Sequence, residues 1–147
     1  MAGGKGQGAR ARAKARRLAL QGLYQWQLSG GSAKDILSEL NASQNTKDVD
    51  TEYFSELLRG VIGTSAELEP LFAPHLDRPL AQLDPIERAI LLLSTFELKE
   101  RLEVPYRVVL NEAVELSKGF GAEESHKYIN AVLDKTSAAL RQAERAG

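Results

Sequence analysis

The sequence DPIERAILLLSTFEL at residues 84–98 predicts the central helix of the protein. It begins with Asp84-Pro85, an acid at the position that caps a helix and a proline at the first helical position, and Glu87 stands three residues after the acid. This arrangement is typical of a helix start. From Ile86 to Leu98 apolar residues cover most of the circumference of the predicted helix, which indicates a central helix packed on several sides.

The sequence after this central helix predicts two more helices, each with one apolar face. Val104-Pro105 marks the turn into the first of them, and Gly119 and Gly121 interrupt it. The second helix ends in a charged tail. The apolar positions of the two helices are Val109, Ala113, Leu116 and Phe120, and then Ile129, Val132, Leu133, Thr136 and Leu140.

The sequence before the central helix predicts shorter helices joined by helix-breaking residues. A first helix runs to Ser29, where Gly30-Gly31 end it, and a short helix follows Ser32. Residues 41–47 are polar and indicate a loop. The apolar positions of the two helices are Leu20, Leu23, Tyr24 and Leu28, and then Ile36, Leu37 and Leu40.

A third helix is expected to open at Val49-Asp50 and to end at Gly63. Thr64 and Glu67 have the spacing of a capping box, so another helix is predicted to start at once. Three prolines in the following 15 residues indicate that it is short or irregular. They are Pro70, Pro74 and Pro79.

Together these patterns predict an all-α protein, a single compact domain of about six or seven helices. No run of residues indicates a strand, and the longest apolar run has five residues, far fewer than the roughly 18–20 that cross a bilayer. The sequence has no cysteine, which excludes disulfides and thiol catalysis and fits a reducing, cytoplasmic location. The predicted divisions are a flexible Gly-rich tail at residues 1–8, a helical domain at 9–143 and a tail at 144–147.

The net charge of −1 conceals a strong separation of charge along the chain. Of the 19 basic residues, seven lie in residues 1–34, which contain no acid. Residues 35–147 contain the remaining 12 basic residues and all 20 acidic residues. A basic N-terminal arm on an acidic body indicates a polyanionic partner, although such a terminus can also act only as a solubilising tail.

The arm is better suited to phosphate than to a membrane surface. At helical spacing its five cations occupy two faces with alanines between them, so the arm lacks the apolar face that a membrane-bound helix needs. Guanidinium groups match phosphate oxygens in pairs. The candidate nucleic-acid residues of the arm are Arg10, Lys14 and Arg17 on one face and Arg12 and Arg16 on the other.

Aromatic residues near the arm offer surfaces on which RNA bases could stack. Tyr24 and Trp26 follow within three helical turns of Arg16, and the two rings are about 160° apart around the helix. Tyr24 also lies on the apolar stripe of the first helix, where it would be at least half buried. We therefore expect that one of the two rings lies at a surface contact.

No catalytic or metal-binding pattern emerges from the sequence. Nucleotide-binding loops, the nucleophile-elbow motif and the zinc-protease motif are absent from it. Glu123 and His126 have the spacing of a di-iron ligand pair, but such a site needs a second pair, and His75 has no matching glutamate. We expect no catalytic residue, no metal and no cofactor. Lys127 and Tyr128, beside this pair, are instead placed for a phosphate and a base.

Four segments together resemble the NusB family of bacterial transcription antitermination factors. They are LALQGLYQWQLS at 18–29, DVDTEYFSELLRGV at 48–61, PIERAILLLSTFEL at 85–98 and VPYRVVLNEAVELSKGFGAEESHKYINAVLDK at 104–135. The resemblance spans about residues 9–138, and the last segment is its most specific part. Tyr128 stands where the family often has Phe, Ala131 where Gly is frequent and Gly22 where Ala is usual. Since a tyrosine ring can also stack on a base, the first departure leaves RNA binding intact.

The resemblance implies two small helical bundles packed together and an activity of binding rather than catalysis. Proteins of this family pair with the ribosomal protein NusE, hold boxA RNA and join an antitermination complex on RNA polymerase with other Nus factors, notably on ribosomal RNA operons. Carried over to this sequence, the family's basic arm falls on Arg12, Lys14 and Arg16, and the partner side includes Glu87. The other RNA-side positions are Tyr24, His75, Lys127 and Tyr128, with Lys118 close by in sequence.

Two other readings remain open at this point. The chain could be an all-helical protein-interaction module without direct RNA binding, whose arm is only solubilising. NusB-like domains also precede certain ribosomal RNA methyltransferases, but the sequence leaves no room for a cofactor-binding fold, so we expect no enzyme.

Overall fold

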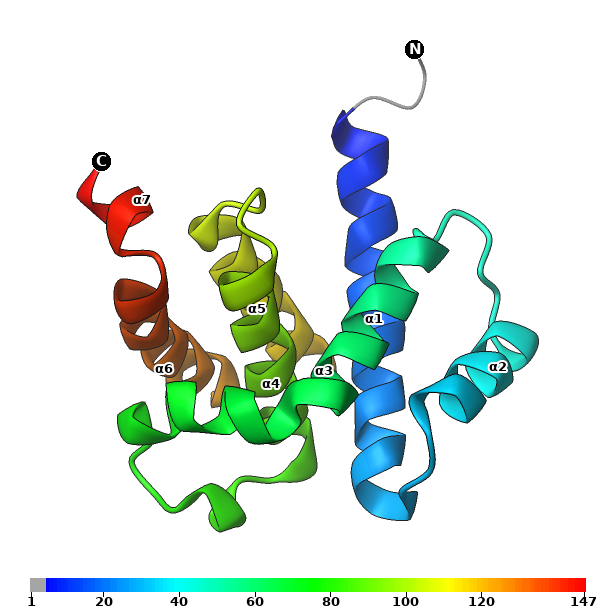
Figure 1. Ribbon diagram of the computed structural model, residues 1–147, viewed down its shortest axis with the longest axis horizontal. Coiled ribbons are helices and arrows are strands. Elements are labelled where there is room, and N and C mark those ends of the chain that lie inside the picture. The colour runs from blue at the N-terminus through cyan, green and yellow to red at the C-terminus, as the bar shows by residue number, and fades with distance from the viewer. Residues whose placement is uncertain (1–4) are drawn as a thin grey trace. The chain divides into compact units, whose positions relative to one another are not determined.

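The structure is a computed structural model that describes residues 5–147, with side chains from Gly8 onward (Figure 1). The described residues form seven α-helices and two short 3-10 turns, without a strand. The all-α prediction and the expected number of helices are confirmed. The chain divides into two compact units, unit 1 up to Gly63 and unit 2 from Thr64 to Gly147.

Unit 1 contains helix α1 (Lys5–Ser29), helix α2 (Ala33–Ser43) and the first part of helix α3 (Thr51–Phe72). The predicted end of the first helix at Ser29 is confirmed. Gly30 and Gly31 follow it with φ of +74° and +95°, a conformation that glycine adopts without strain. Since α1 begins at Lys5, residues 5–8 of the predicted Gly-rich tail are helical, while residues 1–4 lie outside the described residues.

The start of α2 follows the expected capping pattern. The Ser32 hydroxyl accepts a hydrogen bond from the Asp35 N–H at 3.1 Å, and Ile36, Leu37 and Leu40 are buried as predicted. The helix extends to Ser43, so the loop expected at 41–47 begins three residues later. Figure 1 shows α2 returning beside α1, with which it is in contact.

Side chains of α2 and α3 lie close to the main chain of α1 at Gly22. A Cβ atom added to Gly22 would lie 2.9 Å from Leu58 Cδ1 and 3.3 Å from Ile36 Cγ2, both side chains being buried. This close approach is a physical reason for Gly22 in a helix interior, where glycine is otherwise unfavourable.

Helix α3 bends where the sequence predicts one helix to end and the next to start. Asp50 caps its beginning, since the Asp50 carboxylate accepts a hydrogen bond from the Tyr53 N–H at 3.0 Å. Thr64 has the non-helical φ of −129° and ψ of 17°, and the division between the units falls there. The part beyond the kink is short, and two 3-10 turns follow it, η1 (Ala73–His75) and η2 (Leu80–Gln82).

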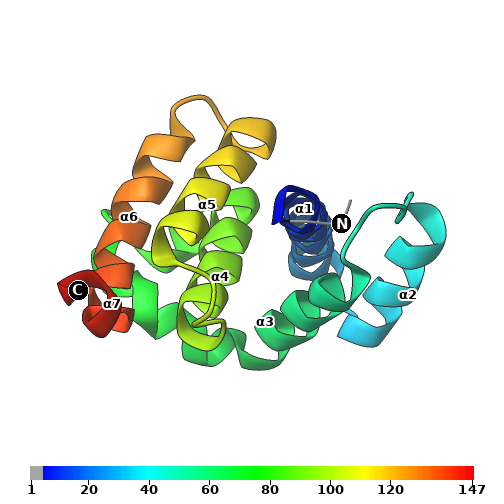
Figure 2. The same ribbon diagram turned by 90° about the horizontal axis from the view of Figure 1, so that it is seen from above.

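Unit 2 is built around the central helix that the sequence predicts. Helix α4 (Pro85–Glu100) begins at Asp84, whose carboxylate accepts a hydrogen bond from the Glu87 N–H at 2.8 Å, and every residue from Ala89 to Leu98 is buried. Helices α5 (Tyr106–Phe120) and α6 (Ser125–Leu140) lie beside α4 and beside each other (Figure 2). The prediction of a helix packed on several sides is confirmed.

Two predicted core positions are wrong. Leu28 is 61% exposed and Phe120 is 39% exposed. Each lies in the last turn of its helix, so the apolar stripe continues past the part of the helix that has a packing partner.

The C-terminal segment is more ordered than a charged tail. Residues Gln142–Ala146 form helix α7, and Arg141 in front of it is buried. The Arg141 guanidinium donates hydrogen bonds to three main-chain carbonyls at the end of α4. They are those of Leu98 at 2.7 Å, Glu97 at 3.2 Å and Arg101 at 3.1 Å. Since the last carbonyls of a helix have no partner within the helix, this side chain caps α4 from a distant part of the sequence.

The described residues contain neither a membrane-spanning helix nor a candidate metal cluster. Among residues 5–147 no helix is both long and apolar enough to span a bilayer. The same residues contain no group of three or more acidic or histidine side chains that could hold a metal ion.

Candidate nucleic-acid interface

The two cationic faces of α1 have different surroundings. Arg12 lies over the ring of the buried Tyr53, with its guanidinium carbon 4.2 Å from the ring centre, and its Nε is 3.8 Å from the Asp50 carboxylate. Arg16 is also near this ring, at 5.6 Å, and only 4% of it is exposed. Both residues therefore fasten α1 to the start of α3 through cation–π and ionic contacts.

This placement corrects the sequence-based view of Arg16 as a free RNA contact. Its guanidinium is used inside unit 1, where an aromatic face lies within reach of a cation. Arg12 keeps about a third of its side chain exposed, so its predicted role in RNA binding stays a prediction.

The other cationic face of α1 points away from the core of unit 1. Arg10 and Arg17 are exposed, and Lys14 between them is partly exposed. Among the described residues, none of these three side chains has an ion pair or a hydrogen bond. Arg10 and Lys14 also line a shallow pocket of about 340 Å³ together with Asp48 and Val49. The residues spaced for one face thus form a cationic surface available to an anion.

The aromatic residues of α1 differ in exposure. Tyr24 is 38% exposed, whereas Trp26 is partly buried and has a polar or ring contact. Like Phe120, Tyr24 is more exposed than its place on the apolar stripe predicts, and it lies on the surface of unit 1. Its assignment as a base-stacking residue stays a prediction.

In unit 2 a second cluster forms around Tyr128 of α6. The guanidinium of Arg78 covers the Tyr128 ring at 4.4 Å from its centre, and the Tyr128 hydroxyl accepts a hydrogen bond from the Asp77 N–H at 3.3 Å. Arg78 Nε donates a hydrogen bond to the Asp77 carboxylate at 2.7 Å. One face of the predicted stacking ring is therefore already occupied by a cation, and a base would use the remaining exposed surface.

Electrostatic contacts within this cluster shift three pKa values. The hydrogen bond from Arg78 lowers the pKa of the Asp77 carboxyl, and the same contact raises the pKa of Arg78. Partial burial of the Tyr128 hydroxyl raises its pKa above the usual value. At neutral pH Asp77 is therefore ionised and Tyr128 is protonated, so the cluster presents a neutral ring beneath a fixed cation.

The remaining predicted RNA residues of unit 2 lie on neighbouring elements. Helix α6, which carries Lys127 and Tyr128, contacts the 3-10 turn η1 that contains the partly buried His75. Lys118 is exposed in the last turn of α5, which packs on α6. Lys127 is exposed and forms an ion pair with Glu124 at 2.6 Å, so an RNA phosphate would compete with this carboxylate.

Glu87, the predicted partner-binding residue, lies largely inside unit 2. Only 7% of the residue is exposed, and its carboxylate accepts a hydrogen bond from the Ser125 hydroxyl at 3.1 Å. Arg78 Nη1 is 3.9 Å from the same carboxylate. Glu87 thus links α4 to α6 and to the Tyr128 cluster. Its role in partner binding stays a prediction, and a substitution there would also change the interior.

The residues that sequence reasoning missed are Asp77, Arg78 and Arg141. Arg78 lies 50 positions before Tyr128, within the proline-containing segment between η1 and η2, and Arg141 lies beyond the last clear apolar position. No periodic pattern marks a contact between such distant residues. An arginine in a proline-rich loop or in a charged tail looks exposed by composition alone.

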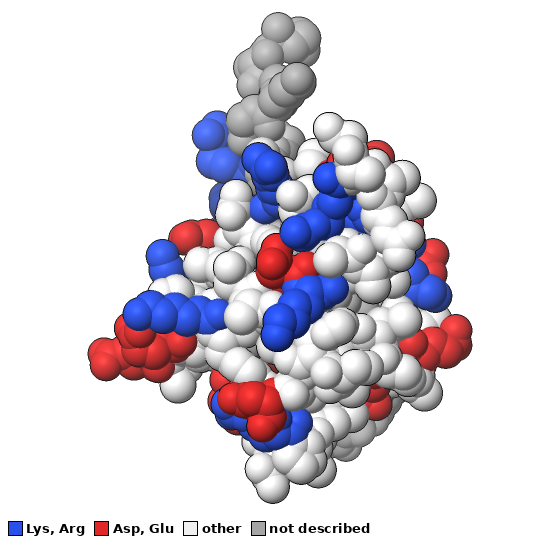
Figure 3. Space-filling model, turned by 90° about the vertical axis from the view of Figure 1, so that its left-hand side faces the viewer, with Lys and Arg blue, Asp and Glu red and all other residues white. Residues whose placement is uncertain are grey.

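Charge on the face of the molecule shown in Figure 3 is mixed rather than uniformly basic. Basic side chains there lie beside acidic ones. Within unit 2, Arg145 forms an ion pair with Asp134 at 3.0 Å. The cationic face of α1 in unit 1 therefore differs from the paired charges that are common in unit 2.

Comparisons with known proteins agree on one family. The sequence model of the NusB family matches residues 13–138. A transcription antitermination protein NusB from Pseudoalteromonas atlantica is 54% identical over 134 residues, which cover 91% of this chain and 96% of that protein.

Solved structures of this family have a similar fold. A NusB structure from T. maritima is 27% identical, with a TM-score of 0.76 over 86% of this chain and 89% of that one. A solved complex of the antitermination factors NusB and NusE with double-stranded RNA contains a chain that is 28% identical. Its TM-score is 0.73 over 88% of this chain and 98% of that one.

Proposed function

The chain belongs to the NusB family, and from this premise we propose that it is a transcription antitermination factor that binds RNA together with the ribosomal protein NusE. The RNA is of the boxA type, recognised as a single strand. The assembly joins other Nus factors on RNA polymerase and lets the enzyme read through terminators, notably in ribosomal RNA operons. This activity is binding in the cytoplasm, without catalysis and without a cofactor or a membrane.

The main structural support for RNA binding is the outward cationic face of α1, which is formed by Arg10, Lys14 and Arg17. These side chains have no partner among the described residues, so binding a phosphate would break no internal contact. Cations that neutralise phosphates release counterions, which gives a sequence-independent and salt-sensitive contribution to affinity. The arm therefore contributes affinity for RNA but not sequence specificity.

We propose that aromatic and polar side chains provide the sequence specificity of RNA binding. Tyr24 in unit 1 and Tyr128 in unit 2 each have exposed ring surface, and unpaired bases stack on such rings. His75, Lys118 and Lys127 would add contacts to base edges or phosphates. NusE, bound to the same protein, would extend the RNA surface and raise the effective concentration of the second binding site.

A mobility-shift assay with boxA RNA, with and without NusE, tests this function. We expect the full-length protein to shift single-stranded boxA RNA, and NusE to raise the affinity. A scrambled RNA of equal length is the control for sequence choice, and a double-stranded form of boxA compares the two RNA states. Failure to shift RNA in the presence and in the absence of NusE would contradict RNA binding and would favour a protein-interaction module.

Replacing Tyr128 by alanine tests the proposed stacking contact in unit 2. Loss of a base–aromatic stack costs about 1–3 kcal/mol, so Tyr128→Ala is expected to weaken boxA binding by at least about fivefold. Tyr128→Phe keeps the ring and loses only the hydrogen bond from Asp77, and it should bind nearly as well as the wild type.

Tyr106 provides the matched control for this test. It is a partly exposed tyrosine of unit 2 whose ring is likewise covered by an arginine, Arg145 at 4.7 Å. Tyr106→Ala should leave RNA affinity unchanged. Equal affinities of Tyr128→Ala and the wild type in a fluorescence-anisotropy titration would remove Tyr128 from the RNA site.

A further inference from the structure

The α2–α3 loop, residues 44–50, is fixed against helix α1 near the start of the basic arm. The Asp50 N–H donates a hydrogen bond to the Ala11 carbonyl of α1 at 3.1 Å, and the Asp50 carboxylate lies 3.8 Å from Arg12. Both contacts are within unit 1. The loop therefore has a defined position beside Arg10 and Lys14.

A tight turn at the end of the α2–α3 loop contains Lys47. The Val49 N–H donates a hydrogen bond to the Thr46 carbonyl at 3.1 Å, which closes a turn with Lys47 and Asp48 at its centre. Asp48 has a φ of +64°, the left-handed conformation that aspartate and asparagine tolerate better than most residues. The Lys47 N–H is held by the Asn45 side chain at 3.0 Å, so the turn is fixed on both sides.

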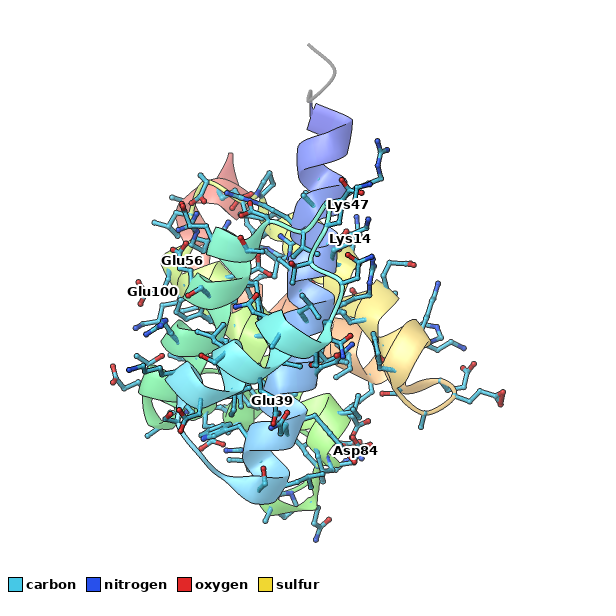
Figure 4. All side chains as sticks on the ribbon, turned by 90° about the vertical axis from the view of Figure 1, so that its right-hand side faces the viewer. Lys14, Glu39, Lys47, Glu56, Asp84 and Glu100 are labelled. Carbon is cyan, nitrogen blue, oxygen red and sulfur yellow. The ribbon has the colours of Figure 1, made fainter. Side chains whose placement is uncertain are left out.

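Lys47 directly precedes Asp48 and Val49, which line the pocket together with Arg10 and Lys14. The pocket wall continues from these α1 residues to Asp48 and Val49, and Lys47 is the exposed residue that precedes them. Figure 4 shows the labelled Lys14 and Lys47 side by side along the upper part of α1. Among the described residues, none of the three cationic side chains has an ion pair or a hydrogen bond.

We propose that this pocket, lined by Arg10 and Lys14 and extended by the adjacent exposed Lys47, is a binding site for the phosphodiester backbone of single-stranded RNA. The inference rests on the proposed function and adds the α2–α3 loop to the RNA surface, which neither the arm nor the aromatic residues include. The pocket lining contains two cations, Arg10 and Lys14, and one carboxylate, that of Asp48, so the site has a net positive charge even without Lys47. Arg10 offers a planar fork and the two lysines offer point charges, a combination that suits the oxygens of a backbone phosphate.

Phosphate fits the site better than the other ligand classes. The pocket is open and shallow, and its wall contains only two apolar residues, Ala11 and Val49, so it offers little surface for an apolar ligand. A carboxylate-rich protein partner would also meet the cations. The salt dependence of RNA binding distinguishes the two, since an RNA phosphate site changes the slope for RNA.

Lys47→Ala in the full-length protein tests the proposal, with single-stranded boxA RNA as the probe. Loss of one phosphate contact should lower the slope of log K against log salt by about 0.7, which corresponds to about fivefold weaker binding at ~0.1 M salt. Lys34→Ala is the control, because it removes the same charge from another exposed position of unit 1.

Asp48→Asn gives a second test in the opposite direction, which misfolding could not imitate. Asparagine tolerates the left-handed backbone of Asp48, and removal of the carboxylate charge should tighten RNA binding about threefold. The combination of a weaker Lys47→Ala, a tighter Asp48→Asn and an unchanged Lys34→Ala supports the site.

Three results would overturn the proposal, and they are distinguishable. If Lys47→Ala keeps the wild-type slope while the double variant Arg10→Ala/Lys14→Ala loses affinity, the loop does not contact RNA and the proposed function stands. If the wild-type protein itself shows no affinity for the RNA, the proposed function fails and the site fails with it. An Asp48→Asn variant that binds no tighter than the wild type also contradicts the site.

Discussion

Simultaneous replacement of Arg10, Lys14 and Arg17 by alanine is expected to weaken boxA RNA binding about a hundredfold at ~0.1 M salt. Each lost phosphate contact lowers the log–log salt slope by about 0.7 for a single strand, so three contacts lower it by about 2. The effect is large because these side chains have no other partner among the described residues and are available to RNA. Titrations at several salt concentrations give both the affinity and the slope.

Substitution is a cleaner test of the arm than deletion of residues 1–17. Ala15 and Arg16 lie within that range and are buried, at 0% and 4% exposure. Their removal would disturb the contact between α1 and Tyr53 of α3, so a loss of RNA binding after deletion could reflect unfolding of unit 1. The three substituted residues are outside this contact.

A matched control removes the same charge elsewhere. Lys34, Arg59 and Lys135 are exposed and lie outside the proposed RNA surface, so their triple alanine variant has the same net charge as the arm variant. It should keep most of the wild-type affinity and slope. If the two triple variants lose affinity equally, net charge rather than the arm controls binding, and the assigned role of α1 is wrong.

Replacement of Arg141 by alanine is expected to lower the free energy of unfolding by about 3–5 kcal/mol. Its guanidinium is almost fully buried and donates to three carbonyls at the end of α4 as well as to the Glu144 carboxylate. Alanine leaves the buried Leu98 carbonyl without this donor, whereas the Glu97 and Arg101 carbonyls keep main-chain hydrogen bonds from Arg101 and Val104. It also leaves the Glu144 carboxylate without its arginine, and the loss of partners by buried polar groups is costly. Arg141→Lys keeps the positive charge but loses the planar guanidinium group. Its free energy of unfolding should therefore lie between those of the wild type and Arg141→Ala.

Urea denaturation of the variants checks this expectation. Arg145→Ala is the control, because Arg145 lies in the adjoining α7 and pairs with Asp134 nearer the surface. A partly exposed ion pair contributes up to about 1 kcal/mol, and Arg145 also lies over the Tyr106 ring and donates to the Ser137 hydroxyl. Since none of these contacts caps α4, this variant should lose clearly less stability than Arg141→Ala. An Arg141→Ala protein as stable as the Arg145→Ala protein would show that α4 does not need this cap.

The helical framework could be predicted from the sequence because its signals are local. Ser32, Asp50 and Asp84 each accept a hydrogen bond from a main-chain N–H three residues later, and the spacing of apolar residues then shows which face is buried. Gly30, with its positive φ, marks the end of α1 in the same local way. A break near Thr64 was also predictable, since a glycine precedes a capping-box spacing there.

Charged residues were harder to place because burial of a charge depends on a distant partner. Arg16 was expected on the surface, but the ring of Tyr53, 37 positions later, gives its guanidinium a place inside unit 1. Glu87 was expected to face a partner, but Ser125 and Arg78 hold its carboxylate within unit 2. From composition alone, every charged residue is expected on the surface. Only the tertiary contacts show which charged residues are buried.

The same reasoning applies to the candidate site. The spacing of Arg10, Lys14 and Arg17 placed them on one face of a helix, and the structure leaves that face outward. Lys47 could not be added from the sequence, because its position depends on the hydrogen bond between Asp50 and Ala11 that fixes the loop against α1. The near-neutral total charge thus combines an acidic remainder with a cationic surface whose members come from two segments.

Terminator read-through in a reconstituted transcription reaction tests the central claim most directly. The template carries boxA upstream of a terminator, and the reaction contains RNA polymerase, NusE and the other Nus factors. We predict that the wild-type protein raises read-through and that the Arg10→Ala/Lys14→Ala/Arg17→Ala variant does not, although it remains folded. Equal read-through with the wild type, with this variant and without the protein would contradict the account.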